Sequence, residues 1–230
     1  MMLVKRYDYK KLKRKNINGK RHYTVDGKPS VSPAPSVTTI LSATAPPEDT
    51  AALKQWRKNV GYAYANQVTT EAANRGTRMH KYLERYMSTG EFPTPGSNPY
   101  AIQANLMAAC VAQYGLMLVD EVWGTEVSLY HPDIYGGTTD CVGVHECQEA
   151  IVDFKQSNKI KPRWRYEGAF MQAAAYGEAH NELYGTNIRK GVIMMCTKDW
   201  EYQEFVVEGI MYDKYRKQWW RRVEEYYSQL

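Results

Sequence analysis

The sequence predicts an α/β fold in which a central β-sheet is flanked by helices, and three observations support this expectation. Apolar residues recur at helical spacing from Thr50 to about Ser88 and again around Ala101–Leu116. Short segments with alternating apolar residues follow, separated by turns. A long helical segment, two further strand segments and a closing helix complete the chain. We therefore expect helices first, then an antiparallel meander, a helix, two strands and a last helix.

Turn and capping residues predict the elements that precede the sheet. Arg21–Val25 is typical of a hairpin strand that ends in a turn at Asp26-Gly27. Ser36 can cap a short helix that runs through Leu41, because its hydroxyl can accept a hydrogen bond from a free amide of the first turn. The long helical stretch is expected to break near Arg75-Gly76-Thr77, with Thr77 as the cap of the second helix.

The elements after the helical region are three strands, a helix, two strands and a helix. Their expected bounds are Glu121–Leu129, Gly137–Val144, Ala150–Lys155, about Arg163–Tyr184, Lys190–Cys196, Tyr202–Val207 and Ile210–Tyr227. The chain shows no internal repeat and no clear linker. We predict a single domain over residues 1–230, with a basic amino-terminal hairpin or arm at 1–35, a helical region at 46–118 and a catalytic core at 119–230.

Composition excludes several classes of protein and leaves the partner open. With 43% hydrophobic and 24% charged residues among 230, the chain is not disordered, collagen-like or a coiled coil. Its net charge of +5 permits an anionic partner without requiring one. The first 30 residues hold ten Lys or Arg and two acids, a net +8, so the remainder sums to −3. This basic run is either a nucleic-acid arm, which we favour, or an aid to solubility.

The location is predicted from segments that the sequence lacks. No apolar run approaches the roughly 20 residues of a membrane helix, and the amino terminus has no apolar core of a secretory signal. We expect a cytoplasmic protein without a membrane partner, in the host cytoplasm if a phage encodes it. The cysteines, which contain no C-x-x-C pair, are expected to be reduced: Cys110, Cys141, Cys147 and Cys196.

Two aspartates and a lysine form the strongest candidate for a reactive site. Asp140 lies in the second predicted meander strand, and Asp153 and Lys155 lie at the end of the third. Residues two apart in a strand share a face, and a short hairpin can bring Asp140 beside that pair. Neighbouring carboxylates repel each other unless a cation lies between them, so this arrangement is typical of a Mg²⁺ site. The alternative is a solvated surface triplet, but an unpaired acid after the apolar segment 150–152 would be costly.

The sequence around these three residues resembles the RecB-like branch of the PD-(D/E)XK nucleases. Further segments match the motifs of this family in the same order: Pro35–Thr38, Arg75–Glu84 with His80, then Glu126, and finally Gln172 with Tyr176. The first of these segments is similar to an amino-terminal signature of stand-alone exonucleases, which include the mitochondrial genome maintenance exonuclease and phage relatives. Each motif alone is weak evidence, but chance rarely produces all of them in this order.

The resemblance implies a restriction-endonuclease-like core, with a central mixed β-sheet flanked by helices, and Mg²⁺ as cofactor, for which Mn²⁺ can substitute. The implied metal ligands are His80, Asp140, Asp153, the backbone carbonyl of Phe154 and, as a further candidate, Glu126. The implied catalytic residues are Asp140, Asp153, Lys155, Gln172 and Tyr176. The cysteines lack the clustered trio that binds an iron–sulfur cluster in some relatives, so no such cluster is expected.

Basic and aromatic residues near these motifs are the expected DNA contacts. They are Ser36, Thr38, Arg75, Arg78, Lys159, Lys161, Arg163, Trp164 and Arg165. Lysine and arginine next to a catalytic strand suit phosphates, so binding should weaken as salt increases. Rings stack on unpaired bases, which favours DNA with single-stranded character or a free end as the partner. Candidate rings are Trp56, Tyr62, Tyr64, Trp164 and Tyr166.

The function that these expectations favour is a Mg²⁺-dependent DNA exonuclease that hydrolyses phosphodiester bonds in phage-type recombination, repair or DNA degradation. Two alternatives stay open. One is a non-catalytic DNA-binding module with a nuclease fold, although no motif residue is missing from this sequence. The other is a structure-specific endonuclease, which would also cut a circular substrate.

Overall fold

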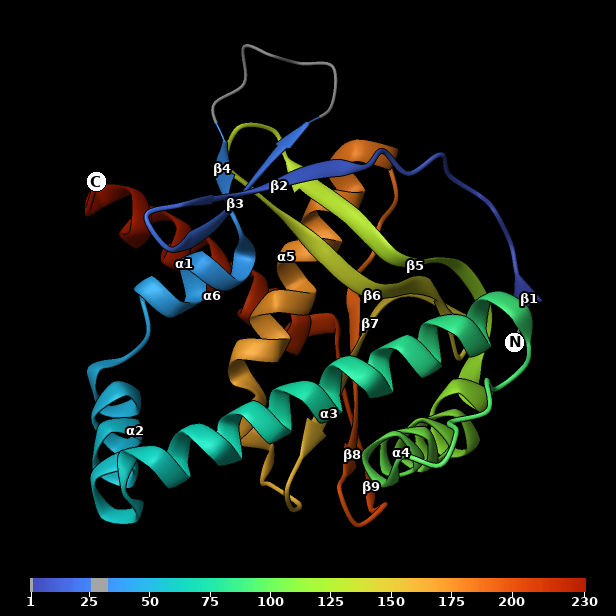
Figure 1. The fold of residues 1–230 in the computed structure, drawn as a ribbon. Helices are drawn as coiled ribbons and strands as arrows, with labels where there is room; N and C mark the ends of the chain where they lie inside the picture. The colour runs from blue at the N-terminus through green and yellow to red at the C-terminus, as the bar shows by residue number, and fades with distance from the viewer. Residues whose placement is uncertain (1, 26–32) are drawn as a thin grey trace.

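The computed structural model describes residues 2–25 and 33–230, and a six-stranded mixed sheet forms its centre (Figure 1). The strand order is β1-β5-β6-β7-β8-β9. These strands are β1 Met2–Leu3, β5 Val119–His131, β6 Tyr135–His145, β7 Gln148–Ser157, β8 Lys190–Thr197 and β9 Tyr202–Glu208. Strands β5, β6 and β7 form an antiparallel meander, whereas β8 runs parallel to β7 and β1 runs parallel to β5. The predicted α/β class with a mixed central sheet is confirmed.

Helices cover both faces of this sheet (Figure 1). The helices are α1 Val37–Ala43, α2 Pro47–Val60, α3 Tyr62–Thr89, α4 Pro99–Tyr114, α5 Glu167–Tyr184 and α6 Gly209–Ser228, with short 3-10 turns at Leu116–Leu118 and Arg163–Tyr166. Side chains alternate along each strand, so Ile151 packs in the core that α5 and α6 close. The next residue, Val152, packs in the core that α3 and α4 close.

The predicted strands after the helical region each lie inside an observed strand, and the predicted last helix lies inside α6. The amino-terminal hairpin also exists, as β2 Leu12–Ile17 paired with β3 Lys20–Val25, and β4 Ala34–Pro35 adds a third short strand. Its turn is formed by Asn18 and Gly19, which have φ values of 51° and 75° and so suit a tight hairpin turn. The predicted turn at Asp26-Gly27 lies outside the described residues.

The prediction of a helix break near Arg75-Gly76-Thr77 is wrong. Helix α3 is continuous through these residues, and the chain bends instead at Gly61, whose φ is 85°. Gly76 lies where the helix passes close to β7, since an added Cβ would lie 3.2 Å from Cγ of Gln156. Thr77 does not cap a helix, because its hydroxyl donates to the carbonyl of Ala73 one turn earlier. Gly76 therefore permits close packing of α3 on the sheet.

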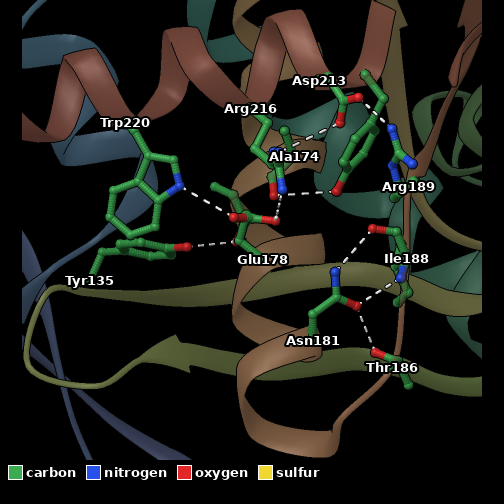
Figure 2. Close-up of polar contacts among 12 residues, drawn as sticks. Tyr135, Ala174, Glu178, Asn181, Thr186, Ile188, Arg189, Asp213, Arg216 and Trp220 are labelled. Carbon is green, nitrogen blue, oxygen red and sulfur yellow. Dashed lines mark hydrogen bonds and ion pairs between the residues drawn. The ribbon is translucent and has the colours of Figure 1, made fainter. Parts of the chain in front are cut away.

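Polar contacts join α5 to α6 and to β6 (Figure 2). The carboxylate of Glu178 accepts a hydrogen bond from Trp220 Nε1 at 3.2 Å and lies 3.7 Å from the Arg216 guanidinium. The buried Tyr135 hydroxyl donates to the carbonyl of Ala175 at 2.9 Å. These bonds fix the position of α5 against the meander. The same helix carries Gln172 and Tyr176 toward the sheet.

One described helical segment, Pro99–Leu118, is long and apolar enough by length and composition to cross a membrane. It comprises α4 and the 3-10 turn after it. Met107, Ala108 and Val111 of this segment pack in a core with strand residues, which is typical of a helix that covers a sheet.

Candidate active site

The site lies where the middle of α3 crosses β6 and β7, and its centre is the carboxylate of Asp140. His80 on α3 places Nδ1 at 3.1 Å from Asp140 Oδ1. The backbone amide of Phe154 on β7 donates to Asp140 Oδ2 at 2.7 Å. The side chains of His80 and Asp140 are 28% and 14% exposed, so both remain reachable from solvent. A helix and two strands thus hold one carboxylate in a fixed orientation.

Asp153 and Lys155 lie beside this carboxylate on one face of β7, as the strand alternation predicts. Their side chains form an ion pair, and Asp153 is buried. Lys155 Nζ also donates to Oε1 of Gln172 on α5 at 3.4 Å. The ammonium group is therefore oriented by one residue of its own strand and one residue of the covering helix.

Glu126 on β5 completes a group of three candidate metal ligands. Ligand atoms of Glu126, His80 and Asp140 all lie within 4.8 Å of one another. In the β5–β6 ladder, Glu126 lies between the paired positions Thr125↔Cys141 and Val127↔Thr139 and so faces Asp140. Its φ is 49°, a left-handed conformation that costs a residue with a side chain on the order of 1 kcal/mol. Such strain is found where a side chain must point in one particular direction.

The pKa values of Asp140 and His80 reflect their contact. Burial alone would raise the pKa of Asp140, but the neighbouring His80, Lys155 and the Phe154 amide outweigh burial and hold this pKa below its usual value. Burial would likewise lower the pKa of His80, but the Asp140 carboxylate outweighs it and raises that pKa. Asp140 is therefore ionised at neutral pH, which is the state that a metal ligand needs.

The pKa values of the neighbouring acids move in the opposite direction. Burial and the Asp140 charge raise the pKa of Asp153, in spite of its ion pair with Lys155. Burial and the Asp140 charge also raise the pKa of Glu126. The two aspartates raise the pKa of Lys155, although burial opposes this. The Asp140 charge thus disfavours ionisation of both neighbouring acids, which is typical of a place where a cation is stabilised.

The donor set suits a hard divalent cation. Carboxylate oxygens are the preferred ligands of Mg²⁺ and Mn²⁺, and an imidazole nitrogen can join them. Among the described residues, the structure brings together His80, Glu126 and Asp140, whereas Asp153 is held by Lys155. Metal ligation by His80, Glu126, Asp140 and Asp153 and by the Phe154 carbonyl stays a prediction. The sequence indicates Glu126 only as a further candidate ligand, whereas the structure groups its carboxylate with His80 and Asp140.

Gln172 and Tyr176 lie on α5 where it covers the sheet next to the site. Tyr176 is buried against Gly137 of β6, since a Cβ added to Gly137 would lie 2.5 Å from the tyrosine hydroxyl oxygen. Burial raises the pKa of Tyr176, so this hydroxyl stays protonated and can donate a hydrogen bond. The glycine three residues before Asp140 in β6 therefore makes room for a side chain of α5.

The residues of the amino-terminal signature have different environments. Ser36 is buried and caps α1, because its hydroxyl accepts a hydrogen bond from the Thr39 amide at 3.0 Å and lies 2.9 Å from the Thr38 hydroxyl. The predicted cap is confirmed, whereas DNA contact by Ser36 stays a prediction. Thr38 is exposed. Ser36 also forms a bridge with Gly136, so the signature is tied to β6.

Of the two predicted DNA-binding arginines of α3, Arg75 lies beside the end of β7. Arg75 Nε donates to Gln156 Oε1 at 3.0 Å, and its guanidinium also binds the side-chain oxygen of Asn158. Arg78 is half-buried and lies two residues before His80. Arg75 is thus held beside the end of the strand that carries Asp153 and Lys155, and DNA contact by either arginine stays a prediction.

The basic run after β7 is mostly exposed, with Lys159, Lys161, Trp164 and Arg165 all open to solvent. Burial, together with the charges of Arg165 and Lys159, lowers the pKa of Lys161, so these cations lie close together. The Arg165 guanidinium lies 4.2 Å from the centre of the Trp164 ring. Arg163 instead donates to the carbonyl of Val206 at 3.0 Å and so anchors the segment to β9.

A pocket of about 680 Å³ lies between the α1–α2 segment and the start of α5. Its lining includes the rings of Trp56 and Trp164 and the cations Lys161, Arg165 and Arg222. It also includes Gly168, which lies one helical turn before Gln172 on the same face of α5. The pocket therefore lies about one helical turn along α5 from Gln172. Arg222, on α6, was not predicted, because no motif or charge pattern distinguishes it from other surface arginines.

Comparison with known proteins agrees with these motifs. No protein-family model matches the sequence. The chain is 29% identical over 226 residues to mitochondrial genome maintenance exonuclease 1 of Mus musculus, which covers 90% of this chain and 64% of that protein. Identity to the Xenopus tropicalis protein of the same name is 27% over 206 residues, covering 84% and 57%, and to the Homo sapiens protein 25% over 203 residues, covering 84% and 58%. The predicted resemblance to these exonucleases is confirmed. The chain spans less than two thirds of the length of these relatives.

Proposed function

We propose that this chain is a metal-dependent deoxyribonuclease that degrades DNA from its ends. The observation that carries the proposal is the donor set of His80, Glu126 and Asp140 beside the ion pair of Asp153 with Lys155. The similarity to proteins named mitochondrial genome maintenance exonuclease 1 supports the choice of an exonuclease. A cluster of acids with a fixed cation next to it suits phosphodiester hydrolysis, in which negative charge builds up on phosphoryl oxygens.

Mg²⁺, or Mn²⁺ in its place, is the proposed cofactor, and when bound it supplies an activated water and neutralises charge on the phosphate. Asp140 is prepared for ligation because His80 and the Phe154 amide already fix its two oxygens. Glu126 supplies the second carboxylate, and Asp153 is a proposed further ligand together with the Phe154 carbonyl. Ligation by His80 requires a neutral imidazole that releases its contact with Asp140, and ligation by Asp153 competes with Lys155, so binding of the cation is coupled to proton release and to local rearrangement.

Lys155 is the proposed catalytic cation. Its ammonium group is directed by Asp153 and by Gln172 Oε1, so it can point at a phosphate oxygen or at the attacking water. Because its pKa is raised, Lys155 stays charged at neutral pH and acts by electrostatic stabilisation and orientation, not as a general base. Tyr176 and Gln172 shape the wall of the site that faces the substrate.

The proposed substrate is DNA whose end is single-stranded. The pocket at the start of α5 offers two tryptophan rings, Trp56 and Trp164, and basic side chains next to them. Stacked rings hold unpaired bases, and cations hold the backbone, which is the common pattern of single-strand binding. The proposed phosphate contacts are Thr38, Arg78, Lys159, Lys161 and Arg165, with Arg75 and Arg163 positioned by contacts to the protein.

The proposal is tested by incubating end-labelled linear DNA and covalently closed single-stranded circles with the chain and Mg²⁺ or Mn²⁺. We expect the linear DNA to shorten from its ends and the circle to remain intact. The Lys155→Ala variant should lose at least about 100-fold in rate, because it removes a fixed charge at the reacting phosphate. Lys217→Ala, which changes an exposed lysine on α6, is the matched control and should cut at the parent rate.

Two other results of this experiment would support a different function. A cut circle would indicate an endonuclease. DNA binding without cleavage of any substrate would indicate a non-catalytic module. A role in phage-type recombination, repair or DNA degradation is an inference from the resemblance. A cytoplasmic location, that of the host if a phage encodes the chain, stays a prediction. Imaging of a fluorescently tagged chain in its native cell tests the location.

A further inference from the structure

The β2–β3 hairpin carries the highest concentration of positive charge in the chain. Residues 10–21 contain seven Lys or Arg and no Asp or Glu: Lys10, Lys11, Lys13, Arg14, Lys15, Lys20 and Arg21. Like charges that lie close together on one surface repel one another, so such a concentration of cations has a cost in stability. This surface has no role in the site described above.

Four of these cations are turned to solvent. Arg14, Lys15, Lys20 and Arg21 are all exposed and form no ion pair with any described acid. The ladder pairs Lys15 with His22 and Ile17 with Lys20, so Lys15 and Lys20 share one face.

The hairpin is attached firmly to the strand that carries Asp140. Tyr23, on the opposite face of the hairpin from Lys15 and Lys20, is buried against Gly136 of β6, where an added Cβ would lie 3.1 Å from the Tyr23 Cβ. The carbonyl of Arg21 accepts hydrogen bonds from the Ser36 amide at 2.9 Å and from a hydroxyl of α1. Gly136 precedes Asp140 by four residues, a strand rise of about 13 Å. The basic face is thus held at a fixed position near the site.

The hairpin and the pocket differ in their aromatic rings, and this difference indicates which form of DNA the hairpin binds. The pocket combines cations with two tryptophan rings. No exposed Tyr, Phe or Trp ring is described at the basic face, because Tyr23, the only such residue in 10–25, is buried, and Tyr226, whose ring centre lies 5.9 Å from Lys20 Nζ, is buried as well. Single strands expose bases that bind to rings, whereas a duplex presents phosphates at its surface. A surface with cations and no exposed rings therefore suits a duplex.

We propose that the face of the β2–β3 hairpin with Lys15 and Lys20 binds the phosphodiester backbone of duplex DNA next to the single-stranded end that enters the site. The six-residue ladder is about 20 Å long, which matches the rise of about six base pairs. The substrate is then a duplex with a single-stranded tail. This inference rests on the proposed function in so far as the tail occupies the nuclease site.

The test compares binding of two DNAs by two variants that lose the same charge. One DNA is a labelled single strand, and the other is the same strand annealed to leave a tail of about ten nucleotides on a duplex of about two turns. Lys15→Gln/Lys20→Gln is the test variant. Lys214→Gln/Lys217→Gln on α6 is the control, and the pairs match because Lys20 and Lys214 each lie near a tyrosine ring. All proteins carry Lys155→Ala, and a chelator is present so that DNA is not degraded.

We expect the hairpin variant to bind the tailed duplex about tenfold more weakly at about 0.1 M salt. The slope of log affinity against log salt should fall by about 1.8, because two phosphate contacts are lost. Binding of the single strand should change less than about twofold, and the control should match the parent with both DNAs. An equal loss for both DNAs would show that the hairpin binds single strands and would overturn the proposal. No loss for either DNA would show that the face is only solvated.

The outcome is independent of catalysis. If the parent chain cleaves no DNA but the hairpin variant still loses duplex affinity, the proposed nuclease function fails and the binding face stands. If the parent cleaves DNA and the variant binds the tailed duplex as the parent does, the binding face fails alone. The substituted side chains are exposed, so the thermal unfolding curve of each variant should match that of the parent and exclude misfolding as the cause.

Discussion

Protonation of His180 is expected to destabilise the protein below neutral pH. His180 lies on α5 and is fully buried, with Nε2 at 3.1 Å from the Tyr9 hydroxyl and Nδ1 at 2.8 Å from the Thr186 hydroxyl. The rings of Tyr7 and Trp123 lie against it. Burial lowers the pKa of His180 from 6.5 to about 4. The folded chain therefore holds this imidazole in its neutral form over most of the acidic range.

The sign of the effect follows from the two pKa values. The unfolded chain binds the proton more readily between pH 6.5 and about 4, because its histidine pKa is the higher one. The stability that neutral His180 contributes is complete above about pH 6.5 and is lost as the pH falls toward 4. A difference of about 2.5 pKa units corresponds to about 3.4 kcal/mol in full, of which about 2 kcal/mol is lost between about pH 7.5 and pH 5.

Urea unfolding followed by tryptophan fluorescence measures this loss. The parent chain and His180→Gln are unfolded at both pH values, and the difference in their free energies of unfolding is taken at each pH. This difference removes the contributions of carboxylates and of other histidines, which both proteins share. We expect the advantage of the parent to shrink by about 2 kcal/mol at the lower pH. An advantage that is the same at both pH values would refute the reasoning.

Three further substitutions test the packing and chemistry of the site. Gly137→Ala should lower the free energy of unfolding by about 1–3 kcal/mol in denaturant titrations, because its Cβ would lie 2.5 Å from the Tyr176 hydroxyl. The control Gly168→Ala should not lower it, because no neighbouring atom lies within 4 Å of the added Cβ. Equal losses for the two variants would contradict this explanation. Glu126→Gly should raise the free energy of unfolding by up to about 1 kcal/mol, because Glu126 has a φ of 49°, which glycine adopts without strain. The same variant should bind Mn²⁺ about tenfold more weakly in calorimetry, because it loses a carboxylate of the donor set. An unchanged Mn²⁺ affinity would exclude Glu126 as a ligand. Trp164→Ala should weaken single-strand binding by about 1–3 kcal/mol in anisotropy titrations, and unchanged binding would exclude stacking.

Strand alternation and capping predicted the fold and part of the site well. The period of two along β7 placed Asp153 and Lys155 on one face, and their ion pair agrees with this. Ser36 was recognised as a cap because a short side-chain hydroxyl before an apolar helical segment has few other uses. These signals are local, so a single sequence carries them fully.

Features that depend on distant contacts could not be predicted from the sequence. Gly76 suggested a helix break, but it permits α3 to pass close to Gln156 of β7, which lies 80 residues further along the chain. The contact between His80 and Asp140 joins residues 60 apart, and only the family motif indicated it. The left-handed conformation of Glu126 has no sequence signal, since glutamate rarely adopts it. The Asn18-Gly19 turn, by contrast, had a signal that was missed.

The most direct measurement of the central claim is metal-dependent cleavage of an end-labelled single-stranded oligonucleotide by the parent chain and by Asp140→Asn. The chain is first treated with a chelator, and Mg²⁺ or Mn²⁺ is then added back in steps. The account predicts no cleavage before the addition, saturable cleavage after it, and a rate for Asp140→Asn that is lower by at least about 100-fold, because this carboxylate touches both His80 and the Phe154 amide at the centre of the donor set. Cleavage that persists in the chelator, or an Asp140→Asn variant that cuts at the parent rate, would contradict it.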